Sequence, residues 1–93
     1  GVDGAEFVMR ASNVEYHAPA RFDDLLECFV RVSRLGRTSV TYDCAAVRRP
    51  DELLMVTATQ ALVLVDLATR RPVPIPEAAR EPIRQFEGAD LVE

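Results

Sequence analysis

The segment from Leu53 to Asp66 constrains the fold most, because it is 14 residues long and is apolar at both odd and even positions. Its β-branched residues and its final Leu-Val-Leu-Val run favour a strand over a helix, although most strands have about five or six residues. Apolar character on both faces indicates a strand in the middle of a sheet that something else covers. The segment therefore predicts a long sheet with a covered face.

Three further segments have the two-residue period of strands, namely Phe7–Tyr16, Leu25–Ser33 and Thr38–Val47. In the second and third segments most of the even positions are apolar, so we expect their even faces to lie on the same side of the sheet. A match of even face to even face favours an odd-numbered hairpin loop, because a slip of one residue would reverse every side chain. Gly36 in this loop is predicted to supply the positive φ of a tight hairpin.

The chain after the strands contains short helical turns. Pro76 suits the first position of a helix, whereas Pro82 is expected to break that helix into two short turns, and Gly88 is expected to end the second. Such turns are too short to cover four long strands, and a sheet with an apolar face needs a helix or a second sheet against it. We expect either a partner chain or an N-terminal helix to provide this cover.

Size and charge exclude several classes of protein. The 93 residues are enough for one modest domain, and the net charge of −4 comes from interspersed charges without the basic stripe that nucleic acid requires. No apolar run reaches the roughly 20 residues of a membrane span, and the first residues do not resemble a signal peptide. Two cysteines are too few for a disulfide scaffold, so a cytoplasmic protein is the default expectation.

Several short motifs follow one another in a characteristic order. They are Tyr16, Pro19-Ala20-Arg21, Asp23-Asp24, Gly36-Arg37-Thr38-Ser39, Val65-Asp66 and Pro74-Ile75-Pro76-Glu77. In this order and spacing the chain resembles the hotdog-fold acyl-CoA thioesterases, in the family of the 4-hydroxybenzoyl-CoA thioesterases. The resemblance extends from about Phe7 to Phe86.

The resemblance implies an α+β hotdog fold, in which a long antiparallel sheet wraps around a central helix. It implies hydrolysis of acyl-CoA thioesters to the free acid and CoA, with no cofactor beyond the CoA of the substrate, by a homodimer or homotetramer. The family's catalytic carboxylate precedes the central helix in an Asp-x-Asp-x-x-Gly segment, which this sequence lacks. We therefore expect residues 1–93 to form a single domain that is incomplete at its N-terminus, and we assign no catalytic residue.

The hairpin carries the candidates for contact with the nucleotide of CoA. Arginine's planar guanidinium suits phosphate oxygens, and hydroxyl groups beside a glycine add hydrogen bonds. The candidates are Arg34, Gly36, Arg37, Thr38 and Ser39, with Arg37 foremost. The alternative is a solvated turn that keeps the hairpin soluble. The basic pairs Arg48-Arg49 and Arg70-Arg71 fit a plain surface role better than a nucleotide contact.

The loop after the first strand carries the candidates for substrate contact, Tyr16, His17 and Pro19. In the family this loop lies near the active site of the dimer-related subunit, although His17 also fits a surface or packing role. Asp23-Asp24 fits a solvated strand start, since adjacent strand residues point to opposite faces. Cys28 and Cys44 share one predicted face of the hairpin and fit small buried hydrophobic residues.

Two other functions stay open. One is a non-catalytic hotdog module that binds acyl thioesters or serves as an assembly subunit. The other is a hotdog dehydratase, which fits the Pro-Ala-Arg and Gly-Arg-Thr-Ser segments less well.

Overall fold

The computed structural model describes residues 4–19, 21 and 24–93. They form one antiparallel sheet of four strands with the order β1-β4-β3-β2. The strands are β1 (Ala5–Tyr16), β2 (Leu25–Leu35), β3 (Ser39–Arg49) and β4 (Leu53–Asp66). Helix α1 (Glu77–Glu87) and the short 3-10 helix η1 (Gly88–Asp90) follow the sheet. No helix precedes β1 within the described residues.

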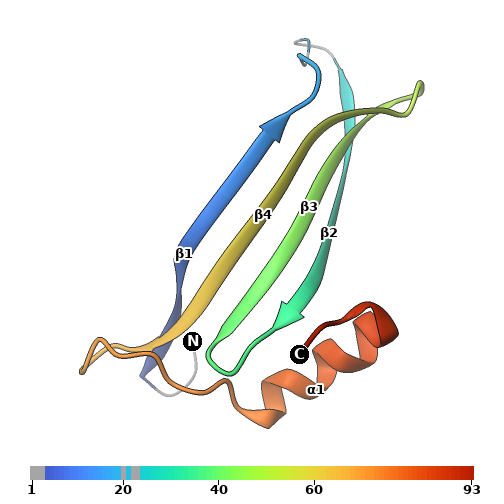
Figure 1. The fold of residues 1–93 in the computed structure, drawn as a ribbon. Helices are drawn as coiled ribbons and strands as arrows, with labels where there is room; N and C mark the ends of the chain where they lie inside the picture. Colours follow the sequence, from blue (N-terminus) through green and yellow to red (C-terminus); the bar gives the residue numbers. More distant parts are fainter. Residues whose placement is uncertain (1–3, 20, 22–23) are drawn as a thin grey trace.

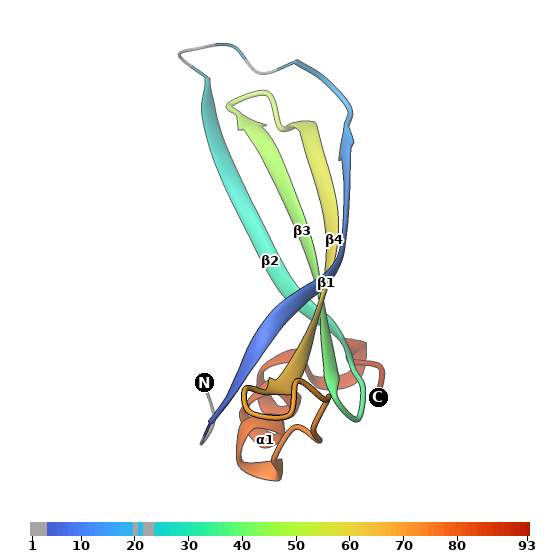
Figure 2. The same cartoon turned by 90° about the vertical axis from the view of Figure 1, so that its left-hand side faces the viewer.

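The sheet is long and strongly twisted, and α1 lies at one of its ends (Figures 1 and 2). At this end β4 finishes and the β2–β3 hairpin turns, so the helix lies beside the hairpin. We call it the hairpin end. The opposite end carries the β1–β2 loop and the β3–β4 turn.

The prediction for β4 is confirmed in both its bounds and its inner position, because β1 and β3 pair with it on either side. Each of the other strands extends beyond its predicted bounds at one end, whereas β3 begins one residue later than predicted, at Ser39. β1 begins two residues before Phe7, at Ala5, where it pairs with the last residue of β4. Cross-strand pairing thus lengthens strands past the point where the sequence alternation stops.

The predicted match of even faces is confirmed, since Val32 lies opposite Tyr42. A bulge between Val32 and Arg34 then shifts the register, so that Leu35 lies opposite Val40 at the tip. An extra residue in one strand changes the parity of the pairing. The match of even faces therefore depends on both the bulge and the loop. The prediction from the sequence considered the loop length alone.

The prediction of a positive φ at Gly36 is wrong, because among the described glycines only Gly4 and Gly88 have one. Gly36 instead serves a close approach of the two strands. A Cβ atom at this position would lie 2.7 Å from Ser39 Oγ. Gly36 N also donates a hydrogen bond of 2.8 Å to Ser39 O.

The predicted break at Pro82 is also wrong, because α1 continues through this residue as one helix. A proline inside a helix removes one backbone hydrogen bond. Here Ala79 and Ile83 on the same helix pack against the hydrophobic core, and such tertiary packing provides most of the stability of a helix. Gly88 ends the helix with φ 63°, as expected.

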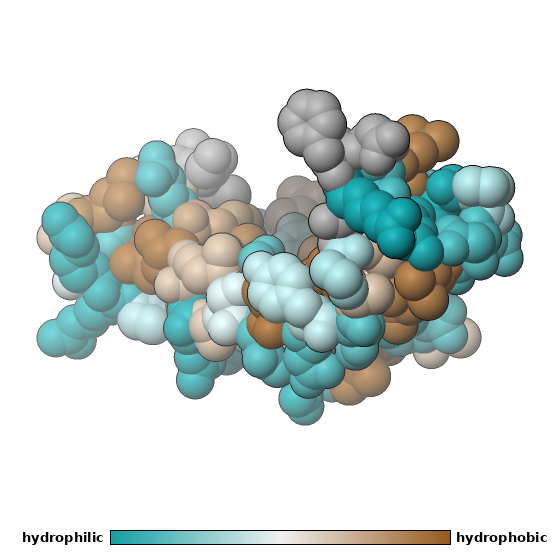
Figure 3. Space-filling view, turned by 90° about the horizontal axis from the view of Figure 1, so that it is seen from above, coloured by the Kyte–Doolittle hydropathy of each residue, from teal (hydrophilic) through white to brown (hydrophobic). Residues whose placement is uncertain are grey.

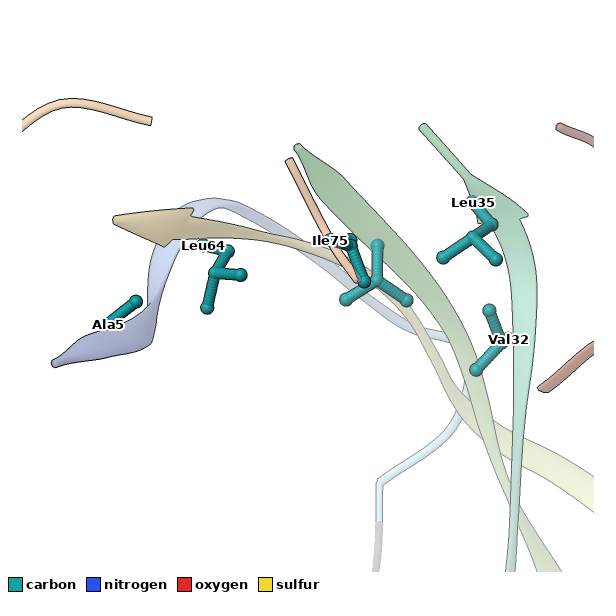
Figure 4. Packing of buried hydrophobic residues seen from close by; sticks show 6 residues of the cluster. Ala5, Val32, Leu35, Leu64 and Ile75 are labelled. Atoms are coloured by element: carbon teal, nitrogen blue, oxygen red, sulfur yellow. The ribbon is translucent and has the colours of Figure 1, made fainter. Parts of the chain in front are cut away.

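The hydrophobic core lies at the hairpin end, where strand residues meet the segment before α1 (Figure 4). Its buried members are Ala5, Val32, Leu35, Val40, Leu64 and Ile75. Partly buried side chains from α1 and the C-terminal segment pack around them, including Ala79, Ile83 and Leu91.

Toward the other end, the same face of the sheet is open. Val30 precedes Val32 by two residues and so shares its face, yet it is 62% exposed, and Val14 is also exposed. Figure 3, viewed from that end, shows apolar residues at the surface beside polar ones. As predicted, the C-terminal helix does not cover the apolar face within the described structure.

Candidate functional site

The tip of the β2–β3 hairpin is held by backbone hydrogen bonds to two other segments. Leu64 N, on β4, donates to Thr38 O at 2.8 Å. Ile75 N, in the segment before α1, donates to Arg37 O at 2.9 Å. These bonds fix the backbone of two of the predicted phosphate-contact residues against the core.

Helix α1 provides a third contact to the hairpin tip. Arg80 Nη1 donates a hydrogen bond of 2.8 Å to Gly36 O. The Arg80 side chain is only 14% exposed, and its Nη2 lies 3.1 Å from a carboxylate oxygen of Glu93. Arg84 binds the same carboxylate at 2.8 Å. Hydrogen bonds from Arg84, and then from Arg80, lower the pKa of Glu93.

Four exposed arginines lie near this end of the sheet, in the hairpin and in the turn after β4 (Figure 1). They are Arg34, Arg37, Arg70 and Arg71. In the part of the chain that the structure describes, no carboxylate lies within 4.0 Å of any of these four guanidinium groups. Thr38 and Ser39 are half-buried beside them. The five predicted phosphate-contact residues thus lie at the hairpin end, on β2, on β3 and in the turn between them.

The basic pair at the opposite end is neutralised. Arg48 lies 2.7 Å from an Asp51 oxygen, and Arg49 lies 2.9 Å from Glu27 and 2.6 Å from Glu52. The hydrogen bond from Arg48 lowers the pKa of Asp51, and the carboxylate partners raise the pKa of both arginines. These contacts agree with the surface role that the sequence favoured for this pair.

The β1–β2 loop is bound to β4. His17 N donates to Met55 O at 2.8 Å, and His17 Nε2 lies 2.8 Å from Thr57 Oγ1. A depression of about 410 Å³ lies at this point, lined by Tyr16, His17, Ala18, Pro19 and Val56. The three predicted substrate-contact residues therefore line one shallow, mostly apolar site.

The acidic pair lies partly outside the described residues, because Asp23 is not among them. The solvated role predicted for Asp24 is wrong, since its side chain is only 13% exposed. Asp24 Oδ2 accepts a hydrogen bond of 2.6 Å from Arg21 N and lies 3.9 Å from Arg48. This carboxylate closes the loop and links it to the β3–β4 turn.

The two cysteines share a face but do not lie directly opposite each other, because Cys28 faces Ala46 and Cys44 faces Val30. Both line an apolar depression of about 270 Å³ on β2, β3 and β4. The interpretation of both as buried is wrong, because Cys28 is exposed and Cys44 is half-buried. The exposure follows from the open face of the sheet.

A larger depression, of about 610 Å³, lies over the middle of β2, β3 and β4. Its polar members include Arg31, Asp43, Thr57 and Thr59. None of these four residues is among the site residues predicted from the sequence. The signal was present, because Thr57 and Thr59 interrupt the apolar residues of β4 at alternate positions.

The structure does not bring the two candidate groups together within one chain. The arginine-rich hairpin and the His17 loop lie at opposite ends of the sheet (Figure 1). At 3.3 Å per residue, the 11 residues of β2 separate them by about 33 Å. No cluster of three or more His, Cys, Asp or Glu side chains suited to a metal ion occurs in the described residues. None of their helices is long and apolar enough to cross a membrane.

Comparison with known proteins agrees with the resemblance. A sequence model of the thioesterase superfamily matches residues 1–55. The acyl-CoA thioester hydrolase YbgC of Escherichia coli O6:H1 is 35% identical over 72 residues, which are 77% of this chain and 53% of that protein. The chain thus spans about half the length of the curated relatives that it matches.

Solved structures give the same result. A thioesterase from Thermus thermophilus, complexed with coenzyme A and Zn, is 32% identical and superposes with a TM-score of 0.78, over 88% of this chain and 60% of that one. A 1,4-dihydroxy-2-naphthoyl-CoA thioesterase from Synechocystis shares the fold at 17% identity, with a TM-score of 0.82 over 92% and 63% of the two chains. The predicted α+β hotdog fold is confirmed. The chain belongs to the thioesterase superfamily.

Proposed function

We propose that this chain is part of an enzyme that hydrolyses acyl-CoA thioesters to the free acid and CoA. The observation that carries the proposal is the anchored hairpin with its exposed Arg37, on the sheet of a thioesterase-superfamily protein. The relatives named above as an acyl-CoA thioester hydrolase and as a thioesterase bound to coenzyme A support this substrate class.

The hairpin would bind the phosphates of CoA. Arg37 would provide the main contact and Arg34 a second one, because a guanidinium group forms paired hydrogen bonds with phosphate oxygens. The hydroxyl groups of Thr38 and Ser39 would donate further hydrogen bonds beside Gly36. Arg34 and Arg37 are exposed, and no carboxylate of the described residues lies within 4.0 Å of either guanidinium group, which supports the role. Arg48 and Arg49, by contrast, have carboxylate partners.

The loop at the other end would contact the substrate through Tyr16, His17 and Pro19. Since about 33 Å separates it from the hairpin, we place the two groups of one chain in different active sites of a homo-oligomer. The edge strand β1 suits such assembly, because an exposed strand edge offers unpaired backbone groups to another chain. A homodimer or homotetramer in the cytoplasm is the proposed state, and a monomeric mass in light scattering would contradict it.

The test is hydrolysis of a panel of acyl-CoA esters by the full-length protein, with released CoA detected by a thiol reagent. Arg37→Ala should raise KM for acyl-CoA by about tenfold to a hundredfold, because hydrogen bonds to charged groups contribute about 1.5–3 kcal/mol. Arg49→Ala is the matched control, and its KM should stay close to that of the wild type.

No thiol release from any ester of the panel would overturn the proposal. Tight binding of CoA without any release would instead support the non-catalytic module that binds acyl thioesters.

A further inference from the structure

We propose that Arg80 is a positioning residue that makes this enzyme prefer thioesters bearing the CoA nucleotide. It does so by holding the tip of the β2–β3 hairpin in the conformation that presents Arg37. This inference rests on the proposed function, because it assumes that the hairpin binds the nucleotide of an acyl-CoA.

Arg80 differs from the other arginines near the hairpin in burial and in partners. The four arginines of the hairpin and the following turn are exposed, whereas the Arg80 side chain is 14% exposed. Its guanidinium group donates to Gly36 O, and Gly36 immediately precedes Arg37. Arg80 therefore acts on the backbone beside the phosphate contact and leaves the phosphate to Arg37.

The far side of the Arg80 guanidinium group is also fixed. Glu93 accepts a hydrogen bond of 3.1 Å from it, and Arg84 holds the same carboxylate through three hydrogen bonds of 2.8–3.0 Å. The C-terminal segment that carries Glu93 is itself bound to β2, since Leu35 N donates to Val92 O at 2.8 Å. The Arg80 side chain thus links α1, the C-terminal segment and the hairpin.

Loss of this link should not unfold the protein. The backbone bonds from Leu64 to Thr38 and from Ile75 to Arg37 do not involve Arg80, and the buried core remains. Only the peptide unit of Gly36 loses its partner from α1. The expected result is a hairpin tip that samples more conformations, so that Arg37 spends less time in the orientation that binds phosphate.

The test compares KM and kcat for an acyl-CoA with those for the corresponding acyl-pantetheine, which carries the same acyl group without the nucleotide. In Arg80→Gln we expect KM for acyl-CoA to rise about fivefold to tenfold, with kcat nearly unchanged, because a uniform binding contact affects KM alone. KM for acyl-pantetheine should stay within twofold. Arg80→Lys, which keeps one charged donor, should recover part of the loss.

Two further variants complete the design. Arg49→Gln is the control, since it removes the same charge at the opposite end of the sheet, where Arg49 binds Glu27 and Glu52. Its KM for acyl-CoA should stay within twofold of the wild type. Glu93→Gln leaves Arg80 in place and should shift KM for acyl-CoA in the same direction as Arg80→Gln, by a smaller factor. It serves as the second variant if Arg80→Gln does not fold.

The outcomes separate this inference from the proposed function. Equal rises in KM for both substrates would show a general structural role and overturn the inference, as would an unchanged KM for acyl-CoA in both Arg80→Gln and Glu93→Gln. A wild-type protein that hydrolyses both substrates with equal KM would also overturn it, while the hydrolase activity would stand. A wild-type protein that hydrolyses neither would instead overturn the proposed function.

Discussion

The effect of Gly36→Ala on stability is predicted to depend on the side chain at Ser39. The added Cβ would lie 2.7 Å from Ser39 Oγ, closer than non-bonded carbon and oxygen atoms approach. The next nearest atom, Ser39 O, is 3.6 Å away, which is an ordinary contact. Because Gly36 does not have a positive φ, the backbone itself accepts alanine. The Ser39 hydroxyl is therefore the single obstacle.

The magnitude follows from two opposing effects. Pushing the Ser39 side chain off its rotamer costs about 0.5–1.5 kcal/mol. Replacing glycine by alanine at a compatible backbone conformation stabilises by about 0.4–1 kcal/mol, because the unfolded chain loses freedom. Gly36→Ala alone should thus change stability by less than about 1 kcal/mol in either direction. In the Ser39→Ala background the clash is absent, so the same substitution should stabilise by about 0.4–1 kcal/mol.

The assay is a double-mutant cycle, in which urea unfolding gives the free energy of unfolding of the wild type, both single variants and the double variant. We expect a coupling free energy of about 0.5–1.5 kcal/mol between the two positions. Gly88→Ala provides the control, because its φ of 63° makes alanine strained whatever the neighbours are. Gly88→Ala should lower the free energy of unfolding by the same amount in the wild type and in the Ser39→Ala variant. A coupling free energy of zero between Gly36→Ala and Ser39→Ala would refute the reasoning.

Two other predictions concern the hairpin end. Leu64→Ala should lower the free energy of unfolding by about 2.5–5 kcal/mol, because the side chain is 1% exposed in the core, whereas Leu67→Ala should cost less than about 1 kcal/mol at 48% exposure. Urea unfolding measures both, and equal costs would contradict the core assignment. Hydrogen bonds from Thr69 N and Ala68 N lower the pKa of Asp66. The stability that this lowered pKa provides is fully present above the pKa of an aspartate in the unfolded chain, about 3.9. It is lost as pH falls through the lower pKa that Asp66 has in the folded protein. The advantage of the wild type over Asp66→Asn should therefore shrink below about pH 4, and a difference that stays constant down to about pH 2 would contradict it.

Sequence patterns predicted those parts of the fold that depend on side-chain alternation. The bounds of β4 followed from its apolar run, and the shared even faces of β2 and β3 followed from their period. The predictions failed where distant residues decide the outcome. Pro82 stays inside α1 because Ala79 and Ile83 pack against the core and support the helix. Sequence rules for proline describe an isolated helix and do not include such contacts.

The residues of the candidate site also fall into those that the sequence predicted and those that only distant contacts reveal. The hairpin residues stood out because Gly36-Arg37-Thr38-Ser39 is a contiguous segment whose residue types suit phosphate. Arg80 gave no such signal, because it lies 44 residues from Gly36 and only the docking of α1 brings them together. The solvated role predicted for Asp24 was wrong for a similar reason, since its partner Arg48 lies on β3, 24 residues further along the chain.

The two ends of the sheet differ in a way that bears on function. At the end with the β1–β2 loop, each arginine of the Arg48–Arg49 pair meets carboxylates, so these charges are already satisfied. At the hairpin end, the arginines with carboxylate partners are Arg80 and Arg84, which hold the structure, while Arg37 has none among the described residues. If Arg37 binds phosphate as proposed, the anionic ligand would meet a guanidinium group on a firmly anchored hairpin, and its binding would stabilise the folded chain.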